Sequence, residues 1–267
     1  ALPSKKEGNR MNIMINTKIK TKTNANNILL VYLTLIVLIG SLSLYLANAV
    51  PEGATITSSS VDTGPNKTPQ SRTDLGGTIT TLRLSLEQQN YAWKGYVGNV
   101  TGTYVLQNSN NKSIYEWPLG TSIVGEVYLS RNQSANFSSG AITCASNAEM
   151  VTEQTFFGMG ATDTDNINNT FNNTNHTTFR VGSNNIAQNA CRSISLWVND
   201  TIQTPSNTSI FQEVTLHDGL NLAYAALINN DQSGFDNTTS FDFQAIVPEN
   251  RSAQTGATYY FYLELGS

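Results

Sequence analysis

The chain has 267 residues, and only 13% of them are charged, about half the share found in an average soluble domain. Residues 1–49 carry six of the fifteen basic side chains, so residues 50–267 hold nine basic against eighteen acidic residues. An acidic, lysine-poor surface argues against nucleic acid and against anionic lipid as partners.

Residues 1–49 have the pattern of an export signal. Lysines precede an uncharged apolar run of 19 residues, 28–46, and an A-x-A pattern follows at residues 47–49. That is the order of a secretory signal peptide, although the run is also long enough to cross a bilayer. Three interpretations stay open: a cleaved signal peptide, an uncleaved membrane anchor, and the retained N-terminal helix of a pilin-like subunit. Each places residues 50–267 outside the cytoplasm, and the last two add the membrane as a partner.

Residues 50–76 are rich in proline and glycine and lack apolar periodicity, which predicts a flexible tether. Residues 77–267 then form the predicted extracellular domain. Leu82, Leu84 and Leu86 alternate with polar residues, which predicts the first strand of this domain.

Strand patterns dominate the rest of the chain. Residues 91–106 have aromatic and β-branched runs on either side of Gly98-Asn99, which predicts a hairpin. Further strand patterns, separated by Asn, Asp, Gly and Ser clusters, cover residues 122–130, 177–183, 194–198, 211–219, 222–228, 241–249 and 257–265. The fold class expected from them is all-β, an antiparallel β-sandwich.

One segment, residues 146–160, favours a short helix. Ser146 is a good N-cap, Glu149 follows three residues later, and Gly158 can end the helix. Apolar residues between them recur at helical spacing. The sequence therefore predicts one short helix beside the first cysteine.

The chain has two cysteines, Cys144 and Cys191, both beyond the export signal. In an oxidising compartment an even pair is typical of one disulfide. The alternative is two buried free thiols. No partnered histidine supports a catalytic cysteine.

The acceptor pattern for N-glycosylation, N-x-[ST], is frequent in the exported part, and none of its copies lies in residues 1–49. It occurs twelve times, about twice the number expected from composition, at Asn66, Asn99, Asn111, Asn132, Asn136, Asn168, Asn172, Asn175, Asn199, Asn207, Asn237 and Asn250. Together with the export signal, this excess favours glycosylation at several sites. Each acceptor must be exposed, so the pattern also predicts which positions face solvent.

Residues 168–179, NNTFNNTNHTTF, contain three of these sites and permit two interpretations. Asp163 and Asp165 lie just before them and suggest a calcium loop, but the spacing lacks the third oxygen ligand and the glycine of an EF-hand. His176 has no second histidine nearby in the sequence. A flexible or glycan-bearing loop is the better interpretation, with its two phenylalanines pinning its ends to the domain.

No motif for catalysis, a metal or a cofactor is present. Glu116 and Glu126 resemble a glycosidase pair only in being two carboxylates near a turn. The aromatic run near the C-terminus offers one binding hypothesis, in which Tyr260 and Tyr262 form a sugar-stacking face. The alternative is an ordinary half-buried strand with tyrosines at its rim.

The core W-x-G-x-x-G-N-V-[ST]-G, here Trp93 to Gly102, occurs with GEVYLSRN, FQEVTLHDG and the closing YYFYLELG. This combination resembles an uncharacterised family of exported archaeal cell-surface glycoproteins, over roughly residues 76–267. The resemblance implies lineage, location and glycosylation, and it carries over no catalytic residue.

These observations lead to an expected function. The chain is expected to be an exported, glycosylated surface protein without catalytic activity, a structural coat or a self-assembling subunit. The alternative is an adhesin or carbohydrate-binding module that uses an aromatic β face. The expected partners are copies of itself, other envelope proteins or glycans, with no cofactor.

Overall fold

Seven strands form one antiparallel sheet at the centre of the molecule. Their order is β1-β15-β5-β11-β10-β6, and β9 pairs with the same edge of β10 as β6. The computed structural model describes residues 50–120, 122–138, 140–251 and 256–266, so the predicted signal segment lies outside the described residues. The strands are β1 (Glu52–Gly53), β5 (Gly125–Ser130), β6 (Thr143–Cys144), β9 (Ser193–Ser195), β10 (Gln212–His217), β11 (Leu222–Leu227) and β15 (Tyr260–Leu265).

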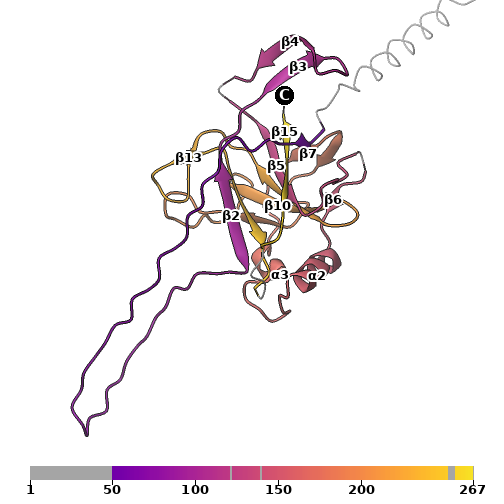
Figure 1. The fold of residues 1–267 in the computed structure, drawn as a ribbon. Coiled ribbons are helices and arrows are strands. Elements are labelled where there is room, and N and C mark those ends of the chain that lie inside the picture. Colours follow the sequence, from indigo (N-terminus) through magenta and orange to yellow (C-terminus); the bar gives the residue numbers. More distant parts are fainter. Residues whose placement is uncertain (1–49, 121, 139, 252–255, 267) are drawn as a thin grey trace, which may run out of the picture. The chain divides into compact units, whose positions relative to one another are not determined.

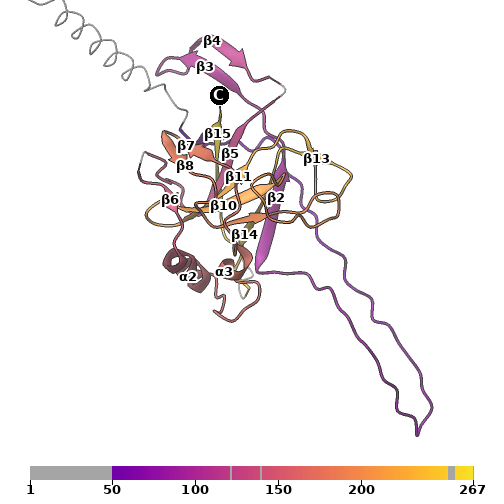
Figure 2. The same cartoon turned by 180° about the vertical axis from the view of Figure 1, so that it is seen from behind.

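Four two-stranded ladders surround this sheet (Figures 1 and 2). All of their pairings are antiparallel. The ladders are β2 (Trp93–Gly98) with β14 (Phe243–Pro248), β3 (Thr103–Gln107) with β4 (Ser113–Pro118), β7 (Phe179–Val181) with β8 (Asn184–Ile186), and β12 (Gln232–Ser233) with β13 (Ser240–Phe241). The described part of the chain is therefore mostly β with antiparallel pairing, which confirms the expected fold class at this level.

Both faces of the central sheet are covered. All six residues of β11 are buried, and they alternate between two hydrophobic clusters. Tyr224 and Ala226 belong to one cluster, whereas Ala223 and Ala225 belong to the other. Because successive side chains of a strand point to opposite faces, one strand contributes to both cores.

Different elements cover the two faces. The first cluster lies beneath the β2–β14 ladder and the helices α2 (Asn147–Phe156) and α3 (Ile167–Thr170). The second cluster is closed by the β7–β8 hairpin and by Phe137 from the loop after β5. The arrangement is sandwich-like, with the central sheet as the shared middle layer.

The predicted helix is confirmed as α2. The Ser146 side chain accepts a hydrogen bond from the backbone N–H of Glu149, and the Glu149 carboxylate accepts one from the backbone N–H of Ser146. This capping box satisfies two N–H groups that lack partners inside the helix. After the helix, Gly158 adopts a φ of +68°, which a glycine accepts without strain.

The hairpin predicted around Gly98-Asn99 is wrong. β2 pairs with β14, whereas β3 pairs with β4. The Asp242 carboxylate accepts a hydrogen bond from the Val100 backbone N–H at 2.7 Å, and the Asp242 N–H donates to the Gly98 carbonyl. These long-range contacts turn the chain out of β2, so local turn residues do not decide the pairing.

Two further expectations fail near the start of the described chain. Residues 82–86 form no strand, although their leucines alternate with polar residues. Conversely, Glu52–Gly53 lies inside the predicted tether and yet pairs with β15 as β1. Residues 54–90 contain no helix or strand and run as two long arms away from β1 and back to β2 (Figure 1).

The Cys144–Cys191 disulfide is confirmed. It joins β6 to the segment that enters β9, and both strands pair with the same edge of β10. The bond therefore holds two short strands, of two and three residues, against the sheet edge.

Replacing both cysteines with alanine should lower the free energy of unfolding by about 4 kcal/mol, because the bridge closes a loop across 47 positions of sequence in the unfolded chain. Urea unfolding followed by circular dichroism measures this loss. A reducing agent should bring the wild-type protein to the same midpoint and leave the double variant unchanged. An unaltered midpoint in the double variant would contradict the prediction.

Candidate functional site

The twelve acceptor asparagines lie at positions that solvent can reach, and none of them is buried. Seven are exposed and five are half-buried. The exposed sites are Asn66, Asn99, Asn111, Asn136, Asn172, Asn199 and Asn237, and the half-buried sites are Asn132, Asn168, Asn175, Asn207 and Asn250. Glycans attach to the side-chain amide and need room around it, so the exposed group is the better accessible one.

Some half-buried sites use the amide nitrogen within the fold. Asn132 Nδ2 donates to the Asp218 carboxylate at 2.8 Å, and Asn175 Nδ2 donates to the Pro205 carbonyl at 3.1 Å. The Oδ1 atom of Asn168 is buried without a hydrogen-bond partner. Attachment at these positions would disturb existing contacts.

The asparagine-rich stretch 168–179 is folded onto the body and begins within the helix α3. Phe171 and Phe179 are both buried, so they fix the stretch to the core as the sequence suggests. Asn166 caps α3 by accepting the N–H of Asn169, and its own amide donates to the carbonyls of residues 160 and 161. Local side-chain hydrogen bonds of this kind give a polar segment a defined shape.

The two aspartates considered for calcium face a cation of the protein itself. Arg251 forms an ion pair with Asp163 at 3.2 Å and a second one with Asp165. Asp163 also accepts a hydrogen bond from the Gly160 backbone N–H. Among the described residues no group of three or more His, Cys, Asp or Glu is placed to hold a metal ion.

His176 is a buried structural histidine. Its Nδ1 lies 2.6 Å from the Thr177 carbonyl, and its Nε2 accepts the Cys191 backbone N–H at 3.0 Å. Burial lowers the pKa of the imidazole, so the neutral ring is favoured, with Nδ1 protonated. The ring thus supports the chain beside the disulfide.

The buried carboxylates differ from the pair considered in the sequence. Glu116 is exposed on β4, whereas Glu126 is buried on β5. The partner of Glu126 is Glu264, directly opposite on β15. The Tyr128 hydroxyl donates to Glu264 Oε2 at 2.9 Å, and the Gly182 N–H donates to the same carboxylate.

Burial and the facing carboxylate act together on this pair. Burial, followed by the charge of Glu264, raises the pKa of Glu126 to about 8. Burial also raises the pKa of Glu264, although the hydrogen bonds from Gly182 and Tyr128 oppose that rise. The β7–β8 hairpin, which supplies Gly182, lies over the pair, so the two carboxyl groups stabilise the contact between the hairpin and the sheet.

The aromatic face predicted for ligand binding is not exposed. Tyr262 is buried, and its hydroxyl donates to the Asn132 carbonyl and accepts from the Ala135 N–H. Tyr260 is half-buried and packs against the same cluster. Tyr262 cannot stack on a sugar, because the loop after β5 covers that face of β15.

Exposed aromatic residues lie instead on the β3–β4 hairpin, which the sequence patterns missed. Tyr115 is 60% exposed and Trp117 49% exposed, with ring centroids 4.9 Å apart. The cross-strand partners of these two residues are Leu106 and Tyr104, and the Tyr104 hydroxyl donates to the Leu265 carbonyl. That bond joins the hairpin to the end of β15. The polar turn before SIYEWP was the signal that could have predicted β4.

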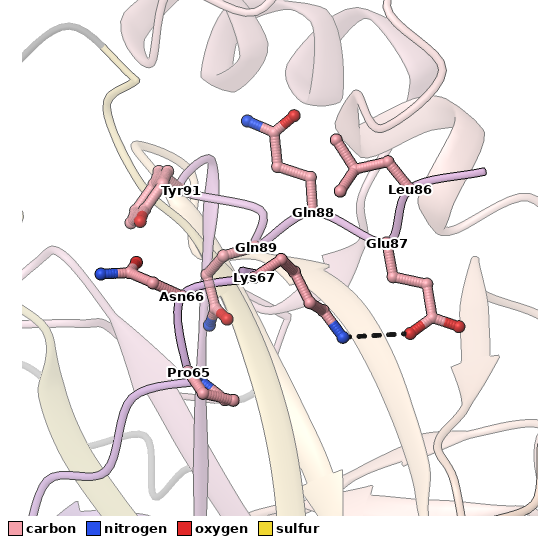
Figure 3. Close-up of a pocket in the computed structure, with 9 residues that line it drawn as sticks. Pro65, Asn66, Lys67, Leu86, Glu87, Gln88, Gln89 and Tyr91 are labelled. Atoms are coloured by element: carbon pink, nitrogen blue, oxygen red, sulfur yellow. Dashed lines mark ion pairs between the residues drawn. The ribbon is translucent and has the colours of Figure 1, made fainter. Parts of the chain in front are cut away.

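A cavity of about 420 Å³ lies between the two arms of residues 54–90 (Figure 3). Every residue that lines it is exposed, and its ion pair, Lys67 with Glu87 at 3.6 Å, is in solvent. Such walls do not exclude water or enforce the position of a ligand. The lining residues are Gly64, Pro65, Asn66, Lys67, Leu86, Glu87, Gln88, Gln89 and Tyr91.

Comparisons of the chain with protein-family models, with curated proteins and with solved structures found no match. Within the described ranges no helix is long and apolar enough to cross a membrane.

Replacing Glu126 with glutamine should stabilise the protein at alkaline pH. The carboxyl group is protonated in the folded state up to about pH 8, whereas in the unfolded chain its pKa has the ordinary value of 4.5. The wild-type protein should therefore lose stability as the pH rises from about 4.5 to about 8. The loss is on the order of 1.4 kcal/mol per unit of pKa difference. Melting temperatures at pH 5, 7 and 9 measure it.

In Glu126→Gln the part of this loss that Glu126 causes should disappear, because the amide keeps the shape and carries no charge. The buried carboxyl groups of Glu213 and Glu264, whose pKa values burial also raises, should keep their own part. Glu116→Gln, on the exposed strand β4, is the matched control and should follow the wild type. If the melting temperatures of the wild type and Glu126→Gln changed with pH in the same way, the raised pKa of Glu126 would be contradicted.

Proposed function

We propose that residues 50–267 are the exported body of an N-glycosylated cell-surface structural protein, a coat or self-assembling envelope subunit without catalytic activity. The observation that carries the proposal is that none of the twelve acceptor asparagines is buried. Glycan attachment requires such accessibility. The number of acceptor patterns is itself above the compositional expectation.

Two further features support export. Cys144 and Cys191 form a disulfide, a bond that persists in oxidising compartments and is rare in the cytosol. The chain is also poor in charge, so neutral Asn, Thr and Ser side chains supply most of its polarity. Attached glycans would supply the remaining solubility of such a surface.

Mass spectrometry of the protein isolated from its producing cells tests this proposal. We expect an intact mass several kilodaltons above that of the polypeptide. Glycopeptide mapping should find the exposed sites Asn99, Asn111, Asn136 and Asn237 modified at high occupancy, because their amides face solvent. Asn132 and Asn175 should be modified several-fold less, because their amides donate hydrogen bonds within the fold.

A mass equal to that of the bare polypeptide would overturn the glycoprotein proposal. The N-terminal residue found in the same experiment separates the three interpretations of residues 1–49. A start at Val50 supports a cleaved signal, a start near Asn26 supports the retained helix of a pilin-like subunit, and an intact leader supports a membrane anchor.

The exposed hairpin favours a second candidate function, a carbohydrate-binding module or adhesin. Tyr115 and Trp117 present aromatic rings on β4 without cover from the described chain. Aromatic rings of this kind form platforms for sugar rings. In this candidate the ligand surface is the β3–β4 hairpin rather than Tyr260 and Tyr262.

Trp117→Ala separates the two candidates. If the protein is a lectin, the variant should weaken retention on immobilised surface polysaccharide by about tenfold, the equivalent of one aromatic contact of about 1.4 kcal/mol, while its oligomeric state stays the same. Ile114→Ala, at an exposed apolar position on the same strand, is the control. Equal retention of the wild type and both variants would rule out a ligand surface on this hairpin.

A further inference from the structure

Residues 54–90 expose apolar side chains that nothing within the described chain covers. Leu82 is 55% exposed, Leu84 90% and Leu86 69%. The segment contributes no helix or strand, and both views show its two arms extending away from the sheets (Figures 1 and 2). Scattered apolar residues on a surface are ordinary, but a regular row of exposed leucines marks an interaction site.

The pattern of the row matches an amphipathic strand. Leu82, Leu84 and Leu86 alternate with Arg83 and Ser85, so in an extended conformation the three leucines share one face. Such a sequence favours a strand that is buried on one side and solvated on the other. Among the described residues this segment pairs with no strand.

The folded domain has a free strand edge, on β2, that such a strand could pair with. Among the described residues β2 pairs with β14 alone. The ladder lies over the central sheet, since the Ile246 N–H of β14 donates to Glu213 of β10. Tyr96 of β2 contacts Phe261 of β15, with ring centroids 5.0 Å apart. Within the ladder, β14 lies toward β10 and β2 lies toward β15. The edge of β2 that faces away from β14 is therefore the free one.

The core between β2 and β15 is incompletely covered on this side. Tyr96, Phe261 and Leu265 are only partly buried where they pack against the first cluster. β15 pairs with β5 along its whole length, but on its other edge β1 covers only Leu263 and Tyr262. A strand added beside β2 would cover these side chains and satisfy its free N–H and C=O groups.

We propose that residues 79–86 of a second copy add as a strand to the free edge of β2, with Leu82, Leu84 and Leu86 packed over Tyr96 and Phe261. This inference rests on the self-assembling form of the proposed function and names its surface. Addition of an extended segment to an exposed sheet edge is a recognised mode of association. Donation in one direction builds a chain of subunits, and mutual donation closes a dimer.

The arms are long enough to reach another molecule. Each arm holds about 18 residues and spans up to roughly 60 Å when extended, more than the diameter of a domain of this size. Lys67 on one arm forms an ion pair with Glu87 on the other, so residue 87 lies with the outgoing arm and not beside β2. This geometry favours a second copy over pairing within the same chain.

Sedimentation velocity over a range of protein concentrations tests the association. Replacing all three leucines with serine, Leu82→Ser, Leu84→Ser and Leu86→Ser, should raise the dissociation constant at least tenfold. The control replaces Val61 and Leu75 with serine, since these apolar side chains are also exposed on the same arms, and it should associate like the wild type. Wild-type protein that stays monomeric, or a control that weakens equally, would overturn the inference.

Cross-linking between two variants that each carry one added cysteine tests the pairing itself. Ser85 faces away from the leucines, and Val97 is 39% exposed on the outer face of β2, so Ser85→Cys and Val97→Cys should form a mixed dimer on oxidation. Ser58→Cys, elsewhere on the arms, should not cross-link with Val97→Cys. A chain carrying both changes that cross-links only within itself would overturn donation by a second copy.

The two proposals fail separately. A monomeric but glycosylated protein would overturn strand donation and leave the surface-glycoprotein proposal in place. A protein that associates but carries no glycans would overturn the glycoprotein proposal and leave strand donation in place.

Discussion

Burial of the central sheet on both faces is the constraint on which the rest of this structure depends. β11 and the neighbouring β10 have almost no exposed side chain, so the chain must supply two separate covers. The β2–β14 ladder and two helices provide one, and the β7–β8 hairpin with its adjoining loop provides the other. At about 25 cal/mol for each Å² of apolar surface removed from water, this two-sided cover is the main source of stability.

Ionisable side chains between the central sheet and the elements that cover it fix the positions of α2 and of the β7–β8 hairpin. Arg131, directly after β5, holds Glu153 of α2 through two hydrogen bonds of 2.9 and 2.6 Å, and its guanidinium lies 3.7 Å from the centre of the Phe156 ring. A planar cation that pairs and stacks at once permits few orientations of the helix. On the opposite face Glu264 has the same role for the β7–β8 hairpin. A chain with few charges thus places several of them where they specify geometry.

The local sequence pattern was sufficient to predict most strands of the central sheet and the helix α2, and the pair of cysteines in an exported chain predicted the disulfide. It worked because those signals are local: the alternation along β15, the capping pair Ser146 and Glu149, and a single possible cysteine pair. It failed where distant residues decide. The side chain of Asp242 turns the chain after β2, and the loop after β5 covers Tyr262. Residues 82–86 have the alternation of a strand but pair with no strand of the described part of the chain, which no local rule can foresee.

The disulfide closes a covalent ring that contains α2, α3 and the β7–β8 hairpin. Any single cut of the backbone between Cys144 and Cys191 therefore leaves both fragments attached to one molecule. The ring includes the loops between these elements, and peptidases cut exposed loops before buried backbone. A chain nicked there stays one covalent molecule, so the bridge provides tolerance to backbone cleavage as well as stability.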